Sequence, residues 1–436
     1  MKRHSQLFKE ICTWKNLEDS YWKARKHKSN NPRIQEFEKH WQLHLLALLK
    51  ELRDKIYTPQ PLRKFILRDP KTRLICVSEF RDRIIHHAIV NALQPIFQPR
   101  FIHDSYASQK GKGTLPALDR LKKFMCKVSK NGKLVLNAEN NNAIEGFALK
   151  ADIQHYFDTV DHIILLELIE KKIKDKELIW LVQKVLDNYN SGTLGKGMPL
   201  GNWTSQFFAN IYLNELDQFV KHVLKAKYYI RYVDDFIILR QSKVQLQEYR
   251  QQIQTFLKKL KLTLHPNKCK ITPLSEGVSF LGFRIFFHYK IVRPRNFRKI
   301  KAKLLGLLDA YEQENIDASQ IIEILRGWNG YAANGNTYTL RQKLTSTLHK
   351  ELLTRRPPSK RTRCLKKINY QNGTLSSCTP FQLQHTNLPT AICTLTFFDI
   401  VCVKWEHASS ASHSYHYFKF VSVPDKKHIV LRIEEN

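Results

Sequence analysis

Two adjacent aspartates interrupt an apolar segment near the middle of the chain. The segment runs from Tyr228 to Leu239, is rich in aromatic and β-branched residues, and carries Asp234 and Asp235 at its centre. Apolar runs on both sides of a short polar step predict two strands joined by a tight hairpin. Aspartate is also a common turn residue, so the pair taken alone favours an ordinary surface turn.

A second apolar run supplies a third carboxylate. Residues 147–157 read Phe-Ala-Leu-Lys-Ala-Asp-Ile-Gln-His-Tyr-Phe, and the apolar part ends at Asp152. Three aspartates at the tips of neighbouring strands can hold two Mg²⁺ ions roughly 3.5 to 4 Å apart. One ion then activates a 3′-hydroxyl and the other neutralises a departing pyrophosphate. The order and spacing of these carboxylates therefore indicate polymerase chemistry.

In this order the residues resemble the palm of a reverse transcriptase. Asp152 stands where the family carries the aspartate of its first catalytic strand, and Tyr232-Val-Asp-Asp235 matches its hallmark hairpin. The segment Phe80-Arg-Asp-Arg83 and the loop from Ser105 to Gly113, with its Gly-Lys-Gly end, resemble the group II intron and retron-like members. The resemblance covers about residues 30–350. It implies an α+β fold of the right-hand polymerase type, with fingers, palm and thumb.

The resemblance also implies roles for individual residues. The catalytic set is Asp152, Asp234, Asp235 and Lys268, where Lys268 is the proton donor to pyrophosphate. The three aspartates and the backbone carbonyl of Ile153 would bind two Mg²⁺ ions, with Mn²⁺ as the alternative. The residues expected to bind the dNTP are Arg73, Phe157, Leu200, Gly201 and Gln206. Those expected to contact nucleic acid are Lys110, Lys112, Tyr232, Gly282, Arg295, Arg298 and Lys299.

Two of these assignments have an ordinary alternative. Phe157 follows Asp152 by five residues, where the family has the aromatic side chain that excludes a ribose 2′-hydroxyl, although a core phenylalanine would also fit. Arg73 matches the basic residue that the family places against the triphosphate, and a solvated arginine at a strand edge is an equal alternative.

The stretch 197–210 differs from most reverse transcriptases. Pro199 and Gly201 predict a turn, and Thr204 or Ser205 is expected to cap the helix that follows. Most members have glutamine before the glycine, but this chain has Leu200, and Gln206 follows the serine. This departure resembles the enzymes of diversity-generating retroelements, which copy a template RNA with frequent errors opposite adenine. Close relatives also have arginine where this chain has Gln109.

Composition is consistent with a nucleic-acid partner. The 436 residues include 72 Lys and Arg against 39 Asp and Glu, a net charge of +33. Because the charge is spread along the chain, nucleic acid is favoured over a membrane surface. The eight cysteines form no C-x-x-C pair, and no apolar run approaches 18 residues. A cytoplasmic protein is expected, and the resemblance implies a bacterial or phage gene.

The sequence predicts a succession of segments. Residues 365–436 contain seven Lys or Arg and five Asp or Glu, and β-branched and aromatic residues are frequent there. The expected segments are an N-terminal helical region (1–58), fingers with a polar insertion at 129–146 (59–146), a palm (147–290), a helical thumb (291–353), a basic linker (354–364) and a β-rich C-terminal module (365–436).

The leading hypothesis is an RNA-directed DNA polymerase of the error-prone, diversity-generating type. The alternatives are a phage-defence or group II intron-like reverse transcriptase and, from another class, a non-catalytic RNA-binding protein. The expected partners are a template RNA, the RNA/DNA hybrid, dNTPs and a small basic oligomeric accessory protein.

Overall fold

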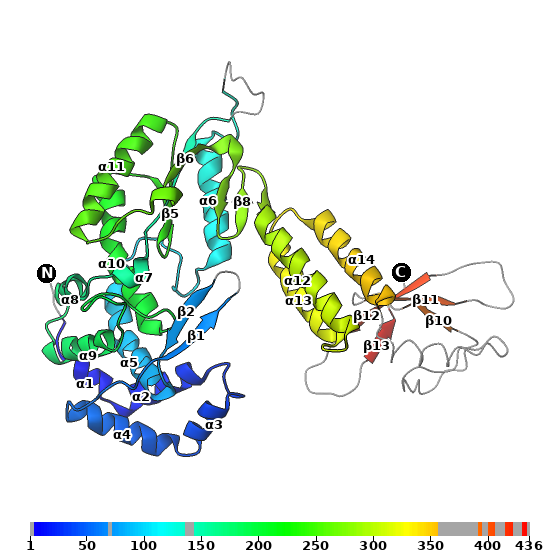
Figure 1. Ribbon diagram of the computed structural model, residues 1–436. Coiled ribbons are helices and arrows are strands. Elements are labelled where there is room, and N and C mark those ends of the chain that lie inside the picture. The colour runs from blue at the N-terminus through cyan, green and yellow to red at the C-terminus, as the bar shows by residue number, and fades with distance from the viewer. Residues whose placement is uncertain are drawn as a thin grey trace. The chain divides into compact units, whose positions relative to one another are not determined.

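A computed structural model describes residues 4–68, 72–135 and 144–355, together with the backbone of four later strands (Figure 1). Those strands form one antiparallel sheet in the order β10 (Ala391–Thr394), β11 (Ile400–Trp405), β12 (Tyr415–Val421) and β13 (Val430–Ile433). The chain divides into two compact units. The first contains Met1–Leu307 and Ser319–His349, and the second contains Leu308–Ala318 and Lys350–Asn436.

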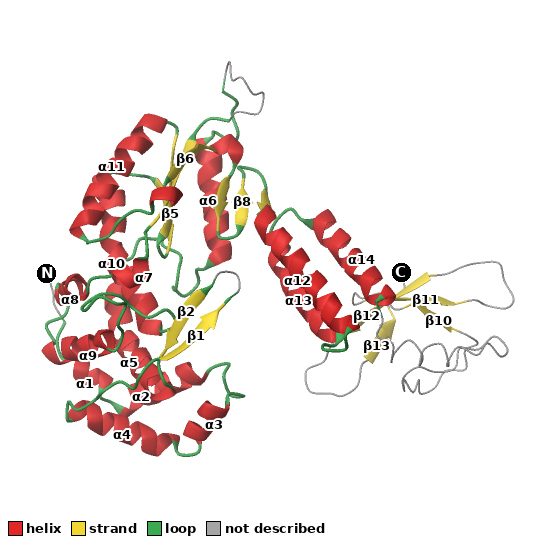
Figure 2. Cartoon of the chain, in the orientation of Figure 1, coloured by secondary structure: helices red, strands yellow, loops and turns green. Residues whose placement is uncertain are grey.

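A four-stranded antiparallel sheet lies at the centre of the first unit (Figure 2). Its order is β4 (Tyr228–Tyr232), β5 (Asp235–Arg240), β3 (Phe147–Asp152) and β6 (Lys270–Pro273). The hairpin predicted around the two adjacent aspartates is therefore confirmed. The strand predicted to end at Asp152 pairs directly with that hairpin through β5.

Helices cover both faces of this sheet, so its strands alternate between two cores. Ala148, Ile230 and Ile237 belong to the core that includes α6 (Thr114–Val128). Leu149 and Phe236, on the opposite face, belong to the core that includes α10 (Trp203–Gln218) and α11 (Lys243–Lys259). The two-residue period of strand side chains explains this division. A sheet buried on both faces holds its strand ends firmly.

The N-terminal region is helical, as expected. Thr13 caps α2 by accepting a hydrogen bond from the backbone N–H of Asn16, and Asn31 caps α3. Helix α2 packs against α5, whose inward face includes Ile85 and Ile89. The helices before the central sheet are α1 (Leu7–Ile11), α2 (Trp14–Arg25), α3 (Pro32–Glu38), α4 (Trp41–Arg53), α5 (Phe80–Phe97), the 3₁₀ turn η1 (Gln98–Arg100) and α6.

The predicted hairpin between residues 63 and 77 is present as β1 (Arg63–Leu67) and β2 (Arg73–Val77), which pair antiparallel. Its expected turn, Asp69-Pro-Lys71, lies outside the described residues. The polar stretch 129–146 follows α6, and residues 136–143 of it also lie outside them.

Short helices connect β3 to α10. They are α7 (Tyr156–Thr159), α8 (His162–Glu170) and α9 (Lys176–Asp187). After α11, the 3₁₀ turns η3 (Pro266–Lys268) and η4 (Leu274–Glu276) flank β6. A separate three-stranded sheet follows, with β7 (Val278–Phe280), β8 (Phe283–Ile285) and β9 (Lys290–Val292). The basic segment after it forms α12 (Pro294–Glu312), α13 (Ala318–Ala332) and α14 (Tyr338–Thr354).

One detail of the prediction for 197–210 is wrong. The residue at the N-cap of α10 is Asn202, while Thr204 and Ser205 lie buried inside the helix. The α-helix ends at Gln218, and a π-helical turn, η2 (Phe219–Val223), leaves Val223 65% exposed. Asparagine is a favoured N-cap residue type, but the side chain of Asn202 accepts a hydrogen bond from the distant backbone N–H of Ser78 and makes none to the backbone of α10.

Four cysteines of the described part, Cys12, Cys76, Cys126 and Cys269, are free thiols, in agreement with the absence of a disulfide pattern. Within that same part of the chain, no helix is both long enough and apolar enough to span a bilayer.

Candidate active site

Sheet pairing brings the three aspartates together. Asp152 at the end of β3 is the register partner of Asp235 at the start of β5, and Asp234 lies in the turn of the hairpin. Burial, reinforced by the Asp152 carboxylate, raises the pKa of Asp234 to about 6. Burial also raises the pKa of Asp235, and the Lys150 ammonium opposes that shift. Desolvation and mutual repulsion both disfavour the charged carboxylates, so a positive charge placed among them would be stabilising.

Two lysines neutralise part of that charge. The Nζ of Lys268, in η3, lies 2.9 Å from Oδ1 of Asp152. The Nζ of Lys150 lies 3.0 Å from Oδ2 of Asp235 and donates to the carbonyl of Ser279 at 2.7 Å. Lys150 was not among the residues predicted to belong to the site. Its signal was position, because residues 150 and 152 of one strand point to the same face.

The carboxylate oxygens of the three aspartates suit a divalent cation, although they do not converge on a single point in this structure. In residues 4–68, 72–135 and 144–355, no three His, Cys, Asp or Glu side chains form a group arranged to hold an ion. However, Oδ1 of Asp235 is buried without a hydrogen-bond partner. A buried, unpaired carboxylate oxygen beside two further carboxylates has the hard oxygen chemistry that Mg²⁺ requires.

A pocket of about 250 Å³ gathers all five residues predicted to bind the dNTP. It is formed by parts of the chain that are far apart in sequence, including β2, the loop before α6, α7, the turn before α10, and the β4–β5 hairpin. The predicted residues that line it are Arg73, Phe157, Leu200, Gly201, Gln206 and Tyr232. The others are Ala107, Ser108, Pro199, Ser205, Asn210 and Val233.

The turn before α10 is seated tightly on β2. The carbonyl of Leu200 accepts a hydrogen bond from the N–H of Cys76 at 3.1 Å. Gly201 has φ +122°, and a Cβ there would lie 2.8 Å from Cγ1 of Val77. Only glycine satisfies both the backbone conformation and the close approach. This seating fixes where the Leu200 side chain meets the pocket.

Phe157 and Gln206 are also held in place. The carbonyl of Phe157 accepts from the N–H of Met198 at 2.6 Å, so the pocket turn and α7 are joined. The Gln206 side chain accepts from the hydroxyl of Ser108 at 2.8 Å, which links α10 to the loop before α6.

A buried histidine connects two segments next to the pocket. Nε2 of His86 lies 2.8 Å from the hydroxyl of Ser78, and Nδ1 lies 2.7 Å from the hydroxyl of Thr204. Burial lowers the pKa of His86 to about 3, so the imidazole is neutral. It connects the start of α5 to α10, and no local sequence pattern revealed this connection.

The residues predicted to contact nucleic acid are more scattered. Lys110, Arg295, Arg298 and Lys299 are exposed, the last three on α12, and none lines the pocket. Gly282 lies between β7 and β8. Lys112, also predicted to contact nucleic acid, makes hydrogen bonds within the protein. Its ammonium donates to the carbonyls of His103 and Ser105, each at 2.8 Å, and so closes its own loop.

Comparison with known proteins agrees with this geometry. The family described as "Reverse transcriptase (RNA-dependent DNA polymerase)" matches residues 67–285, which is just over half of the chain. The chain therefore belongs to the reverse transcriptase family.

Among curated relatives, Group II intron-encoded protein LtrA of Lactococcus lactis subsp. cremoris is 26% identical over 55% of this chain and 49% of its own length. Protein YkfC of Escherichia coli K12 is 27% identical over 56% of this chain and 72% of its own length. The chain thus spans about half the length of the intron-encoded relative that it matches.

Two solved structures that are similar to this chain are telomerases in complex with a TWJ fragment of telomeric RNA. The one from Candida tropicalis has 15% identity and a TM-score of 0.40, covering 70% of this chain and 58% of its own. The one from Candida albicans has 11% identity and a TM-score of 0.39, covering 72% and 64%.

Proposed function

We propose that this protein is an RNA-directed DNA polymerase that makes cDNA from a template RNA. The observation that carries the proposal is the meeting of Asp152, Asp234 and Asp235 at one end of the central sheet, in a chain of the reverse transcriptase family. The hairpin that bears two of them also contributes Tyr232 and Val233 to the adjoining pocket. A carboxylate cluster beside a pocket suits the transfer of a nucleotide to a primer end.

Asp152, Asp234 and Asp235, with the carbonyl of Ile153, would hold two Mg²⁺ ions, or Mn²⁺ in their place. Such ions, when bound, activate the attacking hydroxyl and neutralise charge on the departing pyrophosphate. The protein holds the carboxylates in register across β3 and β5. Lys268, already within hydrogen-bond reach of Asp152, donates a proton to the leaving group in this proposal.

The pocket side chains divide the work of binding the incoming nucleotide. Arg73 supplies a guanidinium for the triphosphate, which it can bind through two parallel hydrogen bonds. Phe157 places a ring where a ribose 2′-hydroxyl would lie, and this favours deoxynucleotides. Leu200 and Gln206 border the base, with the polar end of Gln206 tied to Ser108.

The exposed cations provide an electrostatic surface for the template and the RNA/DNA hybrid. Arg295, Arg298 and Lys299 share α12, and Lys110 extends from the loop before α6. Contacts of this kind to phosphates give affinity that falls as salt concentration rises. A non-catalytic RNA-binding protein would explain the charge, but it would leave the three aspartates without a role.

We further propose the error-prone, diversity-generating subtype, because Leu200 presents an apolar side chain to the pocket where most family members have glutamine. One of the two curated relatives is a group II intron-encoded protein, which supports the group II intron-like alternative. The error spectrum separates the two, since the diversity-generating subtype requires frequent misincorporation opposite template adenine. A small basic oligomeric accessory protein is part of this proposal.

The direct test is primer extension by the purified chain with an RNA template, an annealed DNA primer, dNTPs and Mg²⁺. We expect extension that stops on adding a chelator and that is absent from the Asp235→Asn variant. Binding of the RNA without extension, with Mg²⁺ or Mn²⁺ and with the small basic accessory protein added, would instead support the non-catalytic alternative. Equal yield of correctly initiated cDNA with and without that protein would remove it from the proposal.

A further inference from the structure

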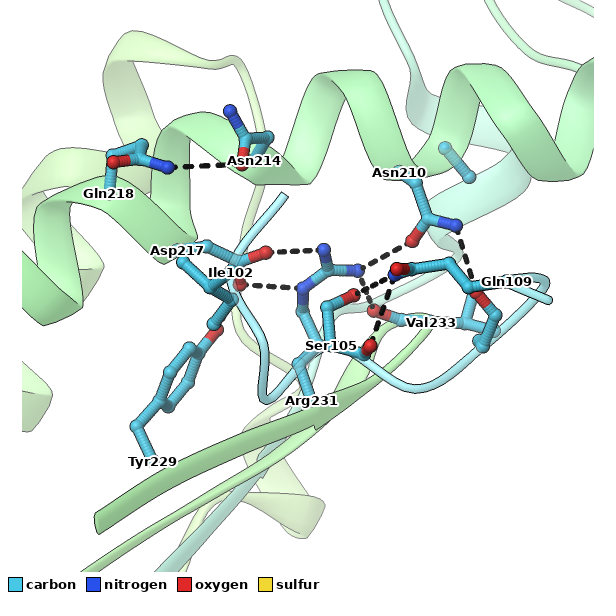
Figure 3. Close-up of polar contacts among 12 residues, drawn as sticks. Ile102, Ser105, Gln109, Asn210, Asn214, Asp217, Gln218, Tyr229, Arg231 and Val233 are labelled. Carbon is cyan, nitrogen blue, oxygen red and sulfur yellow. Dashed lines mark hydrogen bonds and ion pairs between the residues drawn. The ribbon is translucent and has the colours of Figure 1, made fainter. Parts of the chain in front are cut away.

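Arg231 is a fully buried charge at the centre of the hairpin that carries the aspartates. Neither it nor its partner Asp217, on α10, exposes any side-chain surface. The guanidinium binds Asp217 through two bonds, from Nε at 2.7 Å and from Nη2 at 2.5 Å (Figure 3). The hydroxyl of Tyr229 donates to the same carboxylate at 2.7 Å. The Asp217 carboxylate is therefore neutralised by Arg231 and receives a further hydrogen bond from Tyr229.

The remaining nitrogen of the guanidinium is directed to the active-site turn. Nη1 of Arg231 donates to the carbonyl of Val233 at 2.9 Å and to the side chain of Asn210 at 3.2 Å. Val233 has φ +56°, a left-handed conformation that is unfavourable for a β-branched residue. It immediately precedes Asp234. The bond from Arg231 thus holds the backbone at the point where the hairpin turns into the carboxylates (Figure 3).

The backbone of Arg231 joins the same turn to the loop before α6. Its N–H donates to the carbonyl of Asp104, and its own carbonyl accepts from the N–H of Tyr106, both at 3.0 Å. Asn210 continues the connection by donating to the carbonyl of Ala107 at 3.0 Å. A single residue therefore links the aspartate turn, α10 and the loop that supplies Ala107 and Ser108 to the pocket.

We propose that Arg231 is a positioning residue that sets the geometry of Asp234 and Asp235 for metal binding, an inference that rests on the proposed polymerase function. Replacing a buried ion pair with apolar side chains is often neutral for stability, so stability alone does not account for a charge at this place. The planar guanidinium has donors in three directions, and it alone can bind Asp217, Val233 and Asn210 together.

The test removes the pair as a unit. Arg231→Met leaves the Asp217 carboxylate buried and unpaired, so the informative variant is the double replacement Arg231→Met with Asp217→Leu. Tyr229→Phe is the matched control, because it removes a buried hydrogen bond to Asp217 and leaves the bond to Val233 in place. If the double variant does not fold, Arg231→Lys takes its place, since one ammonium cannot span Asp217 and Val233.

Three quantities are measured on each folded variant. They are the kcat and the KM for dNTP in primer extension, and the affinity for Mn²⁺ in the absence of substrate, followed by electron paramagnetic resonance. We expect the double variant to lose kcat by roughly tenfold or more, with a much smaller change in KM. Its Mn²⁺ affinity falls severalfold, while Tyr229→Phe stays close to wild type in all three.

A folded double variant, or a folded Arg231→Lys, with wild-type kcat and wild-type Mn²⁺ affinity would overturn the inference. The Mn²⁺ measurement also separates this inference from the proposed function. If the wild-type chain does not polymerise, weaker Mn²⁺ binding in the double variant but not in Tyr229→Phe still supports positioning by Arg231. An Mn²⁺ affinity of the double variant equal to that of Tyr229→Phe would reject positioning by Arg231.

Discussion

Asp152 and Asp235 are directly opposed across the β3–β5 pair. Cross-strand partners lie on the same face of a sheet, so strand register alone determines the approach of these two carboxylates. A slip of one residue would turn Asp235 to the other face. The buried alternation of Ala148 and Leu149 against their separate cores prevents such a slip. Packing on both faces of the sheet thus fixes the relative positions of the Asp152 and Asp235 carboxylates at the proposed site.

The first prediction concerns these carboxylates. Asp152→Asn or Asp235→Asn is expected to lower Mg²⁺-dependent dNTP incorporation by about a hundredfold or more, because each change removes a charged oxygen ligand. RNA binding, measured by filter retention, should remain at the wild-type level. Asp119→Asn, at a 61% exposed side chain, is the control. Full incorporation by either active-site variant would reject the assignment of the site.

The second prediction concerns sugar choice. Phe157→Ala opens the pocket wall, so we expect incorporation of ribonucleotides to rise by roughly tenfold relative to deoxynucleotides. The measurement is the ratio of kcat/KM for rGTP and dGTP on one primer and template. Phe256→Ala, a half-buried ring stacked on Phe219 and outside the pocket, should leave the ratio unchanged. An unaltered ratio in an active Phe157→Ala enzyme would return Phe157 to an ordinary packing role.

The sequence indicated the strands and the three aspartates because both depend on local pattern. Continuous runs of aromatic and β-branched residues predicted β4 and β5, and the polar step between them predicted the turn at Asp234. The grouping of Arg73, Phe157 and Leu200 in one pocket followed from the family resemblance, since nothing in their spacing brings them together.

The supporting side chains could not be foreseen in the same way. His86 bridges Ser78 and Thr204 from separate elements, so its partners are defined only by the fold. Arg231 did leave a signal, which is a charged residue within a strand of aromatic and β-branched neighbours. Such a charge predicts a buried partner, but Asp217 is identified only when α10 is placed against β4.

The third prediction concerns Gly282 between β7 and β8. It has φ +93°, and a Cβ there would lie 2.2 Å from the hydroxyl of Tyr331, which donates to the Gly282 carbonyl. Gly282→Ala is therefore expected to lower the free energy of unfolding by about 1 to 3 kcal/mol, as measured by urea titration. Gly306→Ala is the control, because its Cβ meets nothing within 4 Å on a helix and should be neutral or stabilising. A Gly282→Ala variant as stable as wild type would contradict the described contact.

The fourth prediction is an acid-dependent loss of stability from His86. Burial lowers its pKa to about 3 in the folded chain, whereas an unfolded histidine has its ordinary pKa near 6.5. Below pH 6.5 the unfolded state binds the extra proton, so the stabilisation falls as pH decreases from 6.5 toward 3. At pH 5 this loss is about 2 kcal/mol. Unfolding titrations between pH 7.5 and pH 5 should show a shallower slope for His86→Gln than for wild type, with exposed His222→Gln as the control. Equal slopes for wild type and His86→Gln would contradict the buried neutral imidazole.

The fifth prediction concerns fidelity and the side chain of Leu200. A glutamine there would offer hydrogen bonds next to the nascent base pair, and a site built on such bonds penalises mismatched geometry because polar groups are left unpaired. Leucine imposes no such penalty. If one hydrogen bond contributes about 1 kcal/mol, Leu200→Gln should reduce errors severalfold, most visibly opposite template adenine.

The measurement is deep sequencing of cDNA made on one RNA template by wild type, Leu200→Gln and Leu194→Gln. Leu194 is the control because it is 97% exposed and does not line the pocket. We expect the adenine error rate to fall only in Leu200→Gln. A wild-type enzyme that copies adenine as faithfully as the other bases, with its own RNA and accessory protein present, would exclude the diversity-generating subtype. That result would leave the intron-like or defence enzyme as the better description, since Leu200 would then line the pocket without loosening its selection.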